Sequence, residues 1–409
     1  MRHHAPSTHA APRIPRRRRG VALALALAAI VVIGALIAGA FYSSNNQYRL
    51  TRTSGNEPRA LAAAELGLNS VITSWTSART NAIRVGASDS LADTTLAGGT
   101  TLKRRWRKLS PTMFWVLATA SSDGGNGQLP SQRSLSAVMH IEIPEFKIAG
   151  AVMSRGTTGA SGNIQISGND VNPSNWDCPP EGSPTAAIAG NNTSTNVTTT
   201  GGCNGGVCLT GTPQIKDTAL VADTMSFSNF GVFNYDSLTV LANKVFTTGT
   251  TFAQVAPTTT LSGGSLVCNT TDANNWGDTG HVALGTVPGP CESYMPVVWL
   301  KGPTQSWTIN GNGGGQGILL VDGNLTLQGQ FKWTGLIIVK GKVTMSGNGG
   351  NGSTGVKVTG AIMAMNRANA GDTFSGTGSV QFSRCVLQTV AGKFATAAPM
   401  KYRAWADVF

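Results

Sequence analysis

Two segments in the last quarter of the chain repeat each other without a gap at an offset of 18 residues. Residues 317–329 (GILLVDGNLTLQG) align with residues 335–347 (GLIIVKGKVTMSG), so each copy holds an apolar strand, a glycine and an alternating strand. Partial copies lie at 360–366 and, far upstream, at 150–156 and 163–168. A fixed repeat of strand and glycine is typical of a β-solenoid, whose coils stack on one another. An antiparallel β-sandwich is the alternative.

The repeat predicts which side chains share the interior of the coils. Leu319 should stack over Ile337, and Leu325 over Val343, because each pair lies at the same point of its coil. Lys340, in the same unit as Ile337, is expected to be exposed. The composition agrees with a mainly β fold, since 12% of the residues are charged and 51 of the 409 are glycine. Low charge disfavours helical bundles, and abundant glycine favours short strands joined by tight turns.

The N-terminal region predicts a membrane segment. Residues 20–42 contain no charge, and four arginines at 16–19 precede them. A helix of that length spans a bilayer, and the excess of arginine on one side places the N-terminus in the cytoplasm. The segment is a plain anchor, a signal peptide with a cleavage site at Ala38-Gly39-Ala40, or a prepilin-type leader that ends at Gly20. Under each interpretation, the rest of the chain lies outside the cytoplasm.

Two helices are expected in this region, over residues 21–53 and 58–76. The second has apolar residues at three- and four-residue spacings, from Leu61 to Trp75. Pro58 suits a first helical turn, and Ser54-Gly55-Asn56 marks a break. We interpret the apolar stripe as a face that packs on the exported domain.

The N-terminal segments resemble the PilX N-terminal region of minor pilin-like proteins. The residues that carry this resemblance are Arg19-Gly20-Val21-Ala22-Leu23, followed by Asn56, Arg59, Ala63-Ala64-Glu65 and Gly67-Leu68. The resemblance implies cleavage by prepilin peptidase after Gly20, which makes Val21 the first residue of the mature protein. It also implies docking of the helix among other pilins or pseudopilins, with Asn56, Arg59 and Glu65 as assembly residues. Leu25 stands where many pilins have glutamate.

Six cysteines in an exported chain predict disulfides. Five lie in a segment rich in Asn, Thr and Gly, namely Cys178, Cys203, Cys208, Cys268 and Cys291, and Cys385 lies outside it. Fifteen pairings are possible for six cysteines. A bond between Cys268 and Cys291 is our hypothesis, because both flank one loop. Cys203 and Cys208 have a spacing compatible with zinc, but no second close pair or histidine completes a site, and we expect no metal.

The strands 112–121 and 133–143 predict a hairpin around a glycine-rich turn. The end of the chain resembles the C-terminus of exported PilX-like proteins in residues 380–385 and 403–405, and we expect Trp405 and Phe409 to cap the solenoid. The predicted organisation is a basic leader (1–20), two helices (21–76), a linker (77–111), a hairpin (112–145), solenoid coils (146–168 and 311–379), a cysteine-containing insertion (169–310) and a cap (380–409).

No catalytic or nucleotide-binding motif is apparent. The match to G-x-G-x-x-G at 347–352 precedes a strand-like run instead of a helix, so it does not predict a dinucleotide site. Asp322 occupies a turn position, and with 19 acidic residues a polysaccharide-cleaving solenoid is disfavoured. The positive charge is concentrated in the leader and at 103–108, which argues against a nucleic-acid partner. We expect no cofactor.

These observations predict a non-enzymatic, minor pilin-like component of a type IV pilus or a type II secretion-like pseudopilus. It would be held in a bacterial inner membrane by residues 21–42 and would display a β-rich domain. The alternatives are a membrane-anchored surface adhesin outside any filament and, less favoured, a carbohydrate-active solenoid enzyme.

Overall fold

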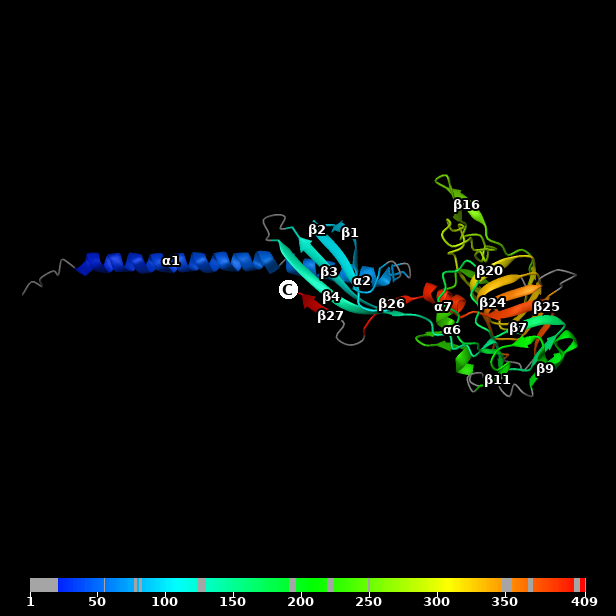
Figure 1. Ribbon diagram of the computed structural model, residues 1–409. Helices are drawn as coiled ribbons and strands as arrows, with labels where there is room; N and C mark the ends of the chain where they lie inside the picture. The colour runs from blue at the N-terminus through cyan, green and yellow to red at the C-terminus, as the bar shows by residue number, and fades with distance from the viewer. Residues whose placement is uncertain are drawn as a thin grey trace, which may run out of the picture.

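The computed structural model describes residues 21–54, 56–76, 79–80, 83–123, 130–190, 196–218, 224–248, 251–347, 355–366, 371–400 and 405–408. Three parts follow one another along the molecule (Figure 1). A long helix projects alone at one end, an antiparallel sheet packed on a second helix occupies the middle, and a parallel β-structure forms the far end. The protein is therefore mainly β with an N-terminal apolar helix.

The predicted pair of helices is confirmed, with α1 at Val21–Ser54 and α2 at Asn56–Thr73. The window Leu23–Tyr48 of α1 has a mean hydropathy of 2.7 and is not buried against the rest of the chain. By length and composition α1 is a candidate membrane span, the one found among the described residues. The large apolar side chains described from Leu23 to Phe41 are exposed, so lipid or other helices must cover them.

The antiparallel sheet lies on the apolar stripe of α2. Its first strands are β1 (Ser88–Leu96), β2 (Thr100–Lys108), β3 (Met113–Ser122) and β4 (Ser131–Glu142), paired in that order. Leu68 of α2 and Trp75, which follows the helix, are buried in one cluster with Trp106 and Phe114. The prediction of a linker over 77–111 was wrong, because β1 and β2 occupy most of it. These strands carry mainly polar residues, and their few inward side chains gave too little alternation to be recognised.

The end of the chain completes this sheet instead of capping the solenoid. Strands β26 (Thr396–Pro399) and β27 (Trp405–Val408) both pair with β4, and Trp405 lies opposite Ala137. The prediction that Trp405 caps the solenoid was therefore wrong, because Trp405 belongs to the antiparallel sheet. Phe409 lies outside the described residues. Pairing with β4 satisfies backbone groups that a free sheet edge would expose. The whole solenoid is thus inserted between β4 and β26.

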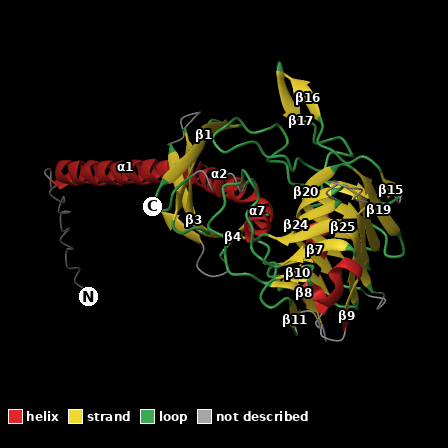
Figure 2. Ribbon diagram, turned by 45° about the vertical axis from the view of Figure 1, so that its right-hand side comes forward, coloured by secondary structure: helices red, strands yellow, loops and turns green. Residues whose placement is uncertain are grey.

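The parallel part is a β-solenoid whose strands stack in two main ladders (Figure 2). The first ladder runs, in spatial order, through β14 (Lys244–Phe246), β18 (Val297–Leu300), β20 (Gly314–Val321), β22 (Lys332–Val339), β24 (Val356–Ala364), β5 (Gly150–Ser154), β8 (Ala186–Gly190) and β11 (Ile215–Asp217). The second runs through β15 (Thr251–Phe252), β19 (Ser306–Gly311), β21 (Asn324–Gly329), β23 (Val343–Gly347), β25 (Asp372–Phe382), β6 (Thr158–Ser161) and β9 (Val197–Thr200).

A third face continues several of these strands around a corner. The first residues of β20, β22 and β24 pair in sequence, and β24 then pairs with the end of β25. Beyond β25 lie β7 (Asn163–Ser167) and β10 (Leu209–Thr210). The corner itself admits only glycine: a Cβ on Gly335 would lie 1.9 Å from the carbonyl oxygen of Gly317, and φ of Gly335 is +148°.

The predicted register of the repeat is confirmed. Leu319 pairs with Ile337 and Leu325 with Val343, and all four side chains are fully buried. The expectation for Lys340 was wrong: its Nζ lies 3.2 Å from Oδ1 of Asp322, and both side chains are largely buried. Lys340 follows strand β22 at a corner of the coil. The ring of Tyr235, the first residue of α6 (Tyr235–Val240), covers its ammonium group.

The chain enters the solenoid in its middle. Strand β5 pairs with β24 on one side and with β8 on the other. From β5 the chain builds coils outward to β11, crosses to the opposite end at β14, and returns coil by coil to β24. The prediction that residues 169–310 form an insertion between coils was therefore wrong, because much of this segment forms coils of the solenoid itself. The strands there are as short as two residues and lack the 18-residue repeat, so no periodic pattern marks them as coils.

Asp372 joins the two halves where they meet. It lies in β25 and is 1% exposed; its Oδ1 accepts from the backbone N–H of Val343 at 2.7 Å, and its Oδ2 accepts from the hydroxyl of Ser154. Ser154 belongs to the outgoing half, whereas Val343 belongs to the returning half. Burial raises the pKa of Asp372 to about 6, although these hydrogen bonds and Lys342 oppose the shift.

The register predicts that substitutions at two adjacent residues of β24 differ sharply in their effect on stability. Val358 is fully buried and Lys357 is exposed. Val358→Asp places an unpaired carboxylate in the interior and should cost several kcal/mol, whereas Lys357→Asp should change the unfolding free energy by less than about 1 kcal/mol. Thermal unfolding of the full-length protein in detergent measures both. Equal melting temperatures for the two variants would contradict the solenoid register.

The buried carboxyl at the junction predicts a pH dependence of stability. Because the pKa of Asp372 is raised in the folded state, that state binds the proton more tightly than the unfolded chain, and stability falls as pH rises from about 4 to about 6. Two pKa units correspond to about 3 kcal/mol. Asp372→Asn should remove this pH-dependent contribution to stability, whereas Asp236→Asn, at an exposed position of α6, should retain it. Denaturant unfolding at pH 4, 5 and 6.5 tests it, and identical pH profiles for Asp372→Asn and wild type would refute it.

Candidate binding groove on the solenoid

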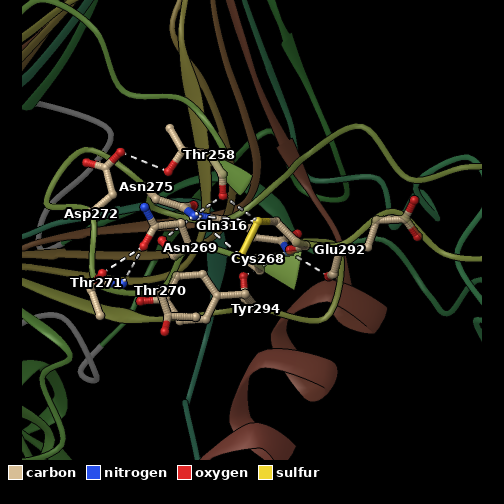
Figure 3. Close-up of a disulfide and its surroundings, with 12 residues drawn as sticks. Thr258, Cys268, Asn269, Thr270, Thr271, Asp272, Asn275, Glu292, Tyr294 and Gln316 are labelled. Carbon is tan, nitrogen blue, oxygen red and sulfur yellow. Dashed lines mark hydrogen bonds between the residues drawn. A yellow bond between two sulfur atoms is a disulfide. The ribbon is translucent and has the colours of Figure 1, made fainter. Parts of the chain in front are cut away.

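The disulfide between Cys268 and Cys291 joins a hairpin to the long loop that follows it (Figure 3). The hairpin consists of β16 (Thr259–Ser262) and β17 (Ser265–Cys268) and projects away from the coils (Figure 1). Its cross-strand pair Leu261 and Leu266 is exposed. The disulfide lies at the base of the hairpin, so it fixes the start of the loop that follows.

Polar contacts order the loop next to the disulfide. The buried amide of Asn275 donates to the carbonyl oxygens of Thr258 at 3.0 Å and Asn269 at 2.9 Å (Figure 3). The carboxylate of Asp272 accepts from the hydroxyl of Thr258 at 2.8 Å. Lys244 of β14 donates to the carbonyl oxygen of Thr270 at 2.7 Å, and burial lowers the pKa of Lys244, against the opposing charge of Asp272. Hydrogen bonds therefore hold a segment that has few apolar side chains to bury.

Gln316 attaches the later part of the loop to a coil. It belongs to β20 and is fully buried, and its Nε2 donates to the carbonyl oxygens of Glu292 at 2.7 Å and Tyr294 at 3.0 Å. Its Oε1 lies 3.1 Å from Nε2 of His281. A single side chain of the solenoid thus binds the loop at two separated places.

His281 and Trp176 form one wall of a groove on the solenoid. The ring of Trp176 stacks on that of His281 with a centroid separation of 4.6 Å, and the amide of Asn175 donates to the carbonyl oxygen of His281 at 2.9 Å. The carboxylate of Glu292 accepts from the backbone N–H groups of Val282 at 2.8 Å and Gly289 at 2.9 Å. Burial favours a raised pKa for Glu292, but these N–H groups and His281 hold the pKa below its ordinary value.

The groove lies between this wall and the third face of the solenoid, and has a volume of about 420 Å³. We call it the lysine groove, because Lys332 of β22 and Lys357 of β24 lie side by side along it in register. Both lysines are exposed. The residues that line it are Val171, Asn172, Pro173, Ser174, Asn175, Trp176, Thr279, Gly280, His281, Lys332, Trp333, Thr334, Lys357, Thr359 and Gln381.

The assembly residues expected from the sequence belong to α1 and α2, which lie outside the solenoid that carries this groove (Figure 1). Val21 is the first residue of α1, where Leu25 is 64% exposed, and Asn56 is the first residue of α2. Arg59 and Glu65 are exposed on α2, away from its buried stripe. Gly20 lies outside the described residues.

All six cysteines are paired. Besides Cys268–Cys291, the structure contains Cys203–Cys208 at an end coil and Cys178–Cys385. The last of these joins residues 207 apart in sequence and connects the loop before β8 to α7 (Arg384–Lys393). It therefore anchors the helix through which the chain leaves the solenoid.

Sequence reasoning did not single out the groove residues. One signal was present: KWTG at 332–335 and KVTG at 357–360 extend the recognised repeat upstream by a lysine and a threonine. Trp176 and His281 gave no such signal, because they come from loops 105 residues apart and meet only in the folded protein.

The pairing of Cys268 with Cys291 can be tested chemically. Peptide mapping of the native protein without reduction should recover the two cysteines in one linked peptide, and a free thiol at either would contradict the bond. Cys268→Ser combined with Cys291→Ser should lower the unfolding free energy by about 3 kcal/mol, because the disulfide closes a loop of roughly 20–25 residues. The single variants should show a comparable loss.

Comparisons with known proteins show a weak structural likeness to a pilin. No protein-family model matches the chain, and no curated protein matches it in sequence. Among solved structures, the competence-associated pilin ComZ from Thermus thermophilus is similar over 86% of this chain and 98% of its own, with 11% identity and a TM-score of 0.24. That score is too low to establish the fold or the function of this chain.

Proposed function

We propose that this protein is a minor pilin-like component of a type IV pilus or a type II secretion-like pseudopilus. The observation that carries the proposal is the course of the N-terminal region: an uncovered apolar helix, α1, is followed directly by α2, which lies under an antiparallel sheet. The role is structural, with the helix as the anchoring and packing element.

The length of α1 supports this role. Its 34 residues extend about 51 Å at 1.5 Å per residue, whereas the hydrocarbon core of a bilayer is about 30 Å thick. The last turns of α1 therefore stand beyond the membrane and separate it from the sheet. An apolar helix of this kind can exchange lipid contacts for contacts with neighbouring helices in a filament.

The position of the solenoid fits a displayed subunit. It is inserted between β4 and β26 and lies on the side of the sheet away from α1 (Figure 1). Helix packing in a filament would leave the solenoid outside, but its bulk would hinder neighbours of the same kind. This favours a minor subunit. Leu25, Arg59 and Glu65 are available on the helices for contacts with other pilins, and we propose them as assembly residues.

The second candidate is a membrane-anchored surface protein that never enters a filament. It is favoured by the same displayed solenoid and needs no processing at Gly20. Prepilin peptidase acts only under the first proposal, so the N-terminus of the native protein separates the two.

The N-terminus of the native protein should be Val21. Mass spectrometry of protein purified from membranes measures it, and Gly20→Leu should leave the full-length precursor, because a larger side chain would block cleavage. Ala38→Leu is the matched control, since it blocks signal peptidase only. A start at Phe41 would establish signal peptidase cleavage, and an intact Met1 would leave a plain anchor; either result would overturn the filament proposal.

A further inference from the structure

We propose that the lysine groove binds an acidic oligosaccharide, with the carboxylate or sulfate groups of the sugar placed against Lys332 and Lys357. This inference goes beyond the proposed function and does not depend on it, because the groove is displayed whether or not the chain enters a filament. It rests on the charge of the groove, the chemistry of its floor and the rigidity of its wall.

The charge of the groove favours an anionic ligand. Lys332 and Lys357 occupy register-matched positions on neighbouring parallel strands, which lie about 4.8 Å apart. Like charges placed opposite each other on a sheet destabilise it. Among the described residues that line the groove there is no aspartate or glutamate to offset them. An anionic group bound between the two ammonium groups would remove the repulsion.

The floor of the groove suits a polyhydroxylated ligand. Thr334, Thr359 and Gln381 follow one another on neighbouring strands at one level of the third face. The Gln381 Nε2 donates to the carbonyl oxygen of Asn169 at 2.6 Å, so its amide has a defined orientation. The Nε2 also donates to the carbonyl oxygen of Phe382 at 3.2 Å, so the two threonine hydroxyls supply donors and acceptors for the hydroxyl groups of successive sugar units, and the Oε1 of Gln381 supplies an acceptor.

The wall supplies an aromatic surface that is held in place. Trp176 lines the groove and is stacked on His281, which Gln316 binds to the solenoid. The disulfide Cys268–Cys291 fixes the same loop at both ends. A preformed wall lowers the entropic cost of binding, and the apolar face of a sugar ring packs on an indole in the way that aromatic residues line other ligand sites.

A saccharide fits these observations better than a single nucleic-acid strand. Proteins that bind single strands stack successive bases on several aromatic side chains. Of the two tryptophans among the lining residues, Trp333 is 1% exposed and belongs to the core, which leaves Trp176 as one platform. Glycoside hydrolysis uses a pair of carboxylates, and the described residues that line the groove include none, so the proposal is one of binding and not of hydrolysis.

The test uses full-length protein in detergent and calorimetric titration with hexagalacturonate as the probe. Wild-type protein should bind it, and Lys332→Ser combined with Lys357→Ser should weaken binding by about tenfold or more, because both charge-assisted contacts to the anionic groups are lost. The control replaces two exposed lysines outside the groove, Lys147→Ser with Lys216→Ser, and removes the same charge. Trp176→Ala should lose affinity, and Trp176→Phe should keep most of it.

Neutral maltohexaose and a thymidine hexanucleotide are titrated alongside, and melting temperatures confirm that every variant is folded. The proposal is supported if hexagalacturonate binds the wild-type protein more tightly than maltohexaose and the hexanucleotide do, and if only the groove variants lose affinity for hexagalacturonate. The proposal fails if hexagalacturonate does not bind, if the control variant loses as much affinity as the groove variant, if maltohexaose binds equally well, or if the hexanucleotide binds more tightly through the same lysines. None of these outcomes alters the processing test at Gly20.

Discussion

The parallel pairing of β24 with β5 makes one solenoid out of two stretches of chain that advance in the same direction along its axis but occupy its two opposite halves. Without this pairing, each stretch would end in an open coil with unpaired backbone groups and exposed apolar side chains. Asp372 reinforces the junction by accepting hydrogen bonds from both stretches. The outer coils depend on the junction, because a solenoid coil buries its apolar face only against a neighbour.

The same junction explains how the solenoid can be inserted into another domain. The chain enters at β5 and leaves after β25, and these strands are neighbours through β6 and β7. The two connections to the sheet therefore start from adjacent coils in the middle of the solenoid. Neither end coil of the solenoid pairs with the antiparallel sheet in the described part of the chain. Strand β26 pairs with β4 across the whole inserted segment. Insertion at neighbouring points disturbs the host domain least.

The binding wall depends on the outer coils. The loop that carries His281 is held by Cys268–Cys291 and by Gln316, whose strand lies on the returning half of the solenoid. Trp176 comes from the outgoing half, in the loop that precedes β8, and Cys178 in the same loop is bound to α7. The groove is thus composed of segments from both halves, and it exists only because the halves are stacked.

The sequence by itself determined the elements that rest on local or periodic signals. The uncharged apolar run fixed α1, and the 18-residue repeat fixed the coils from β20 to β23 together with the pairing of Leu319 with Ile337. Tertiary structure alone decided the rest. The polar strands β1 and β2 are held by their neighbours and by α2, the short strands β10 and β15 exist only as additions to a ladder, and Trp176 meets His281 across the junction. Such contacts leave no trace in local sequence, because their stability comes from surfaces that other parts of the chain provide.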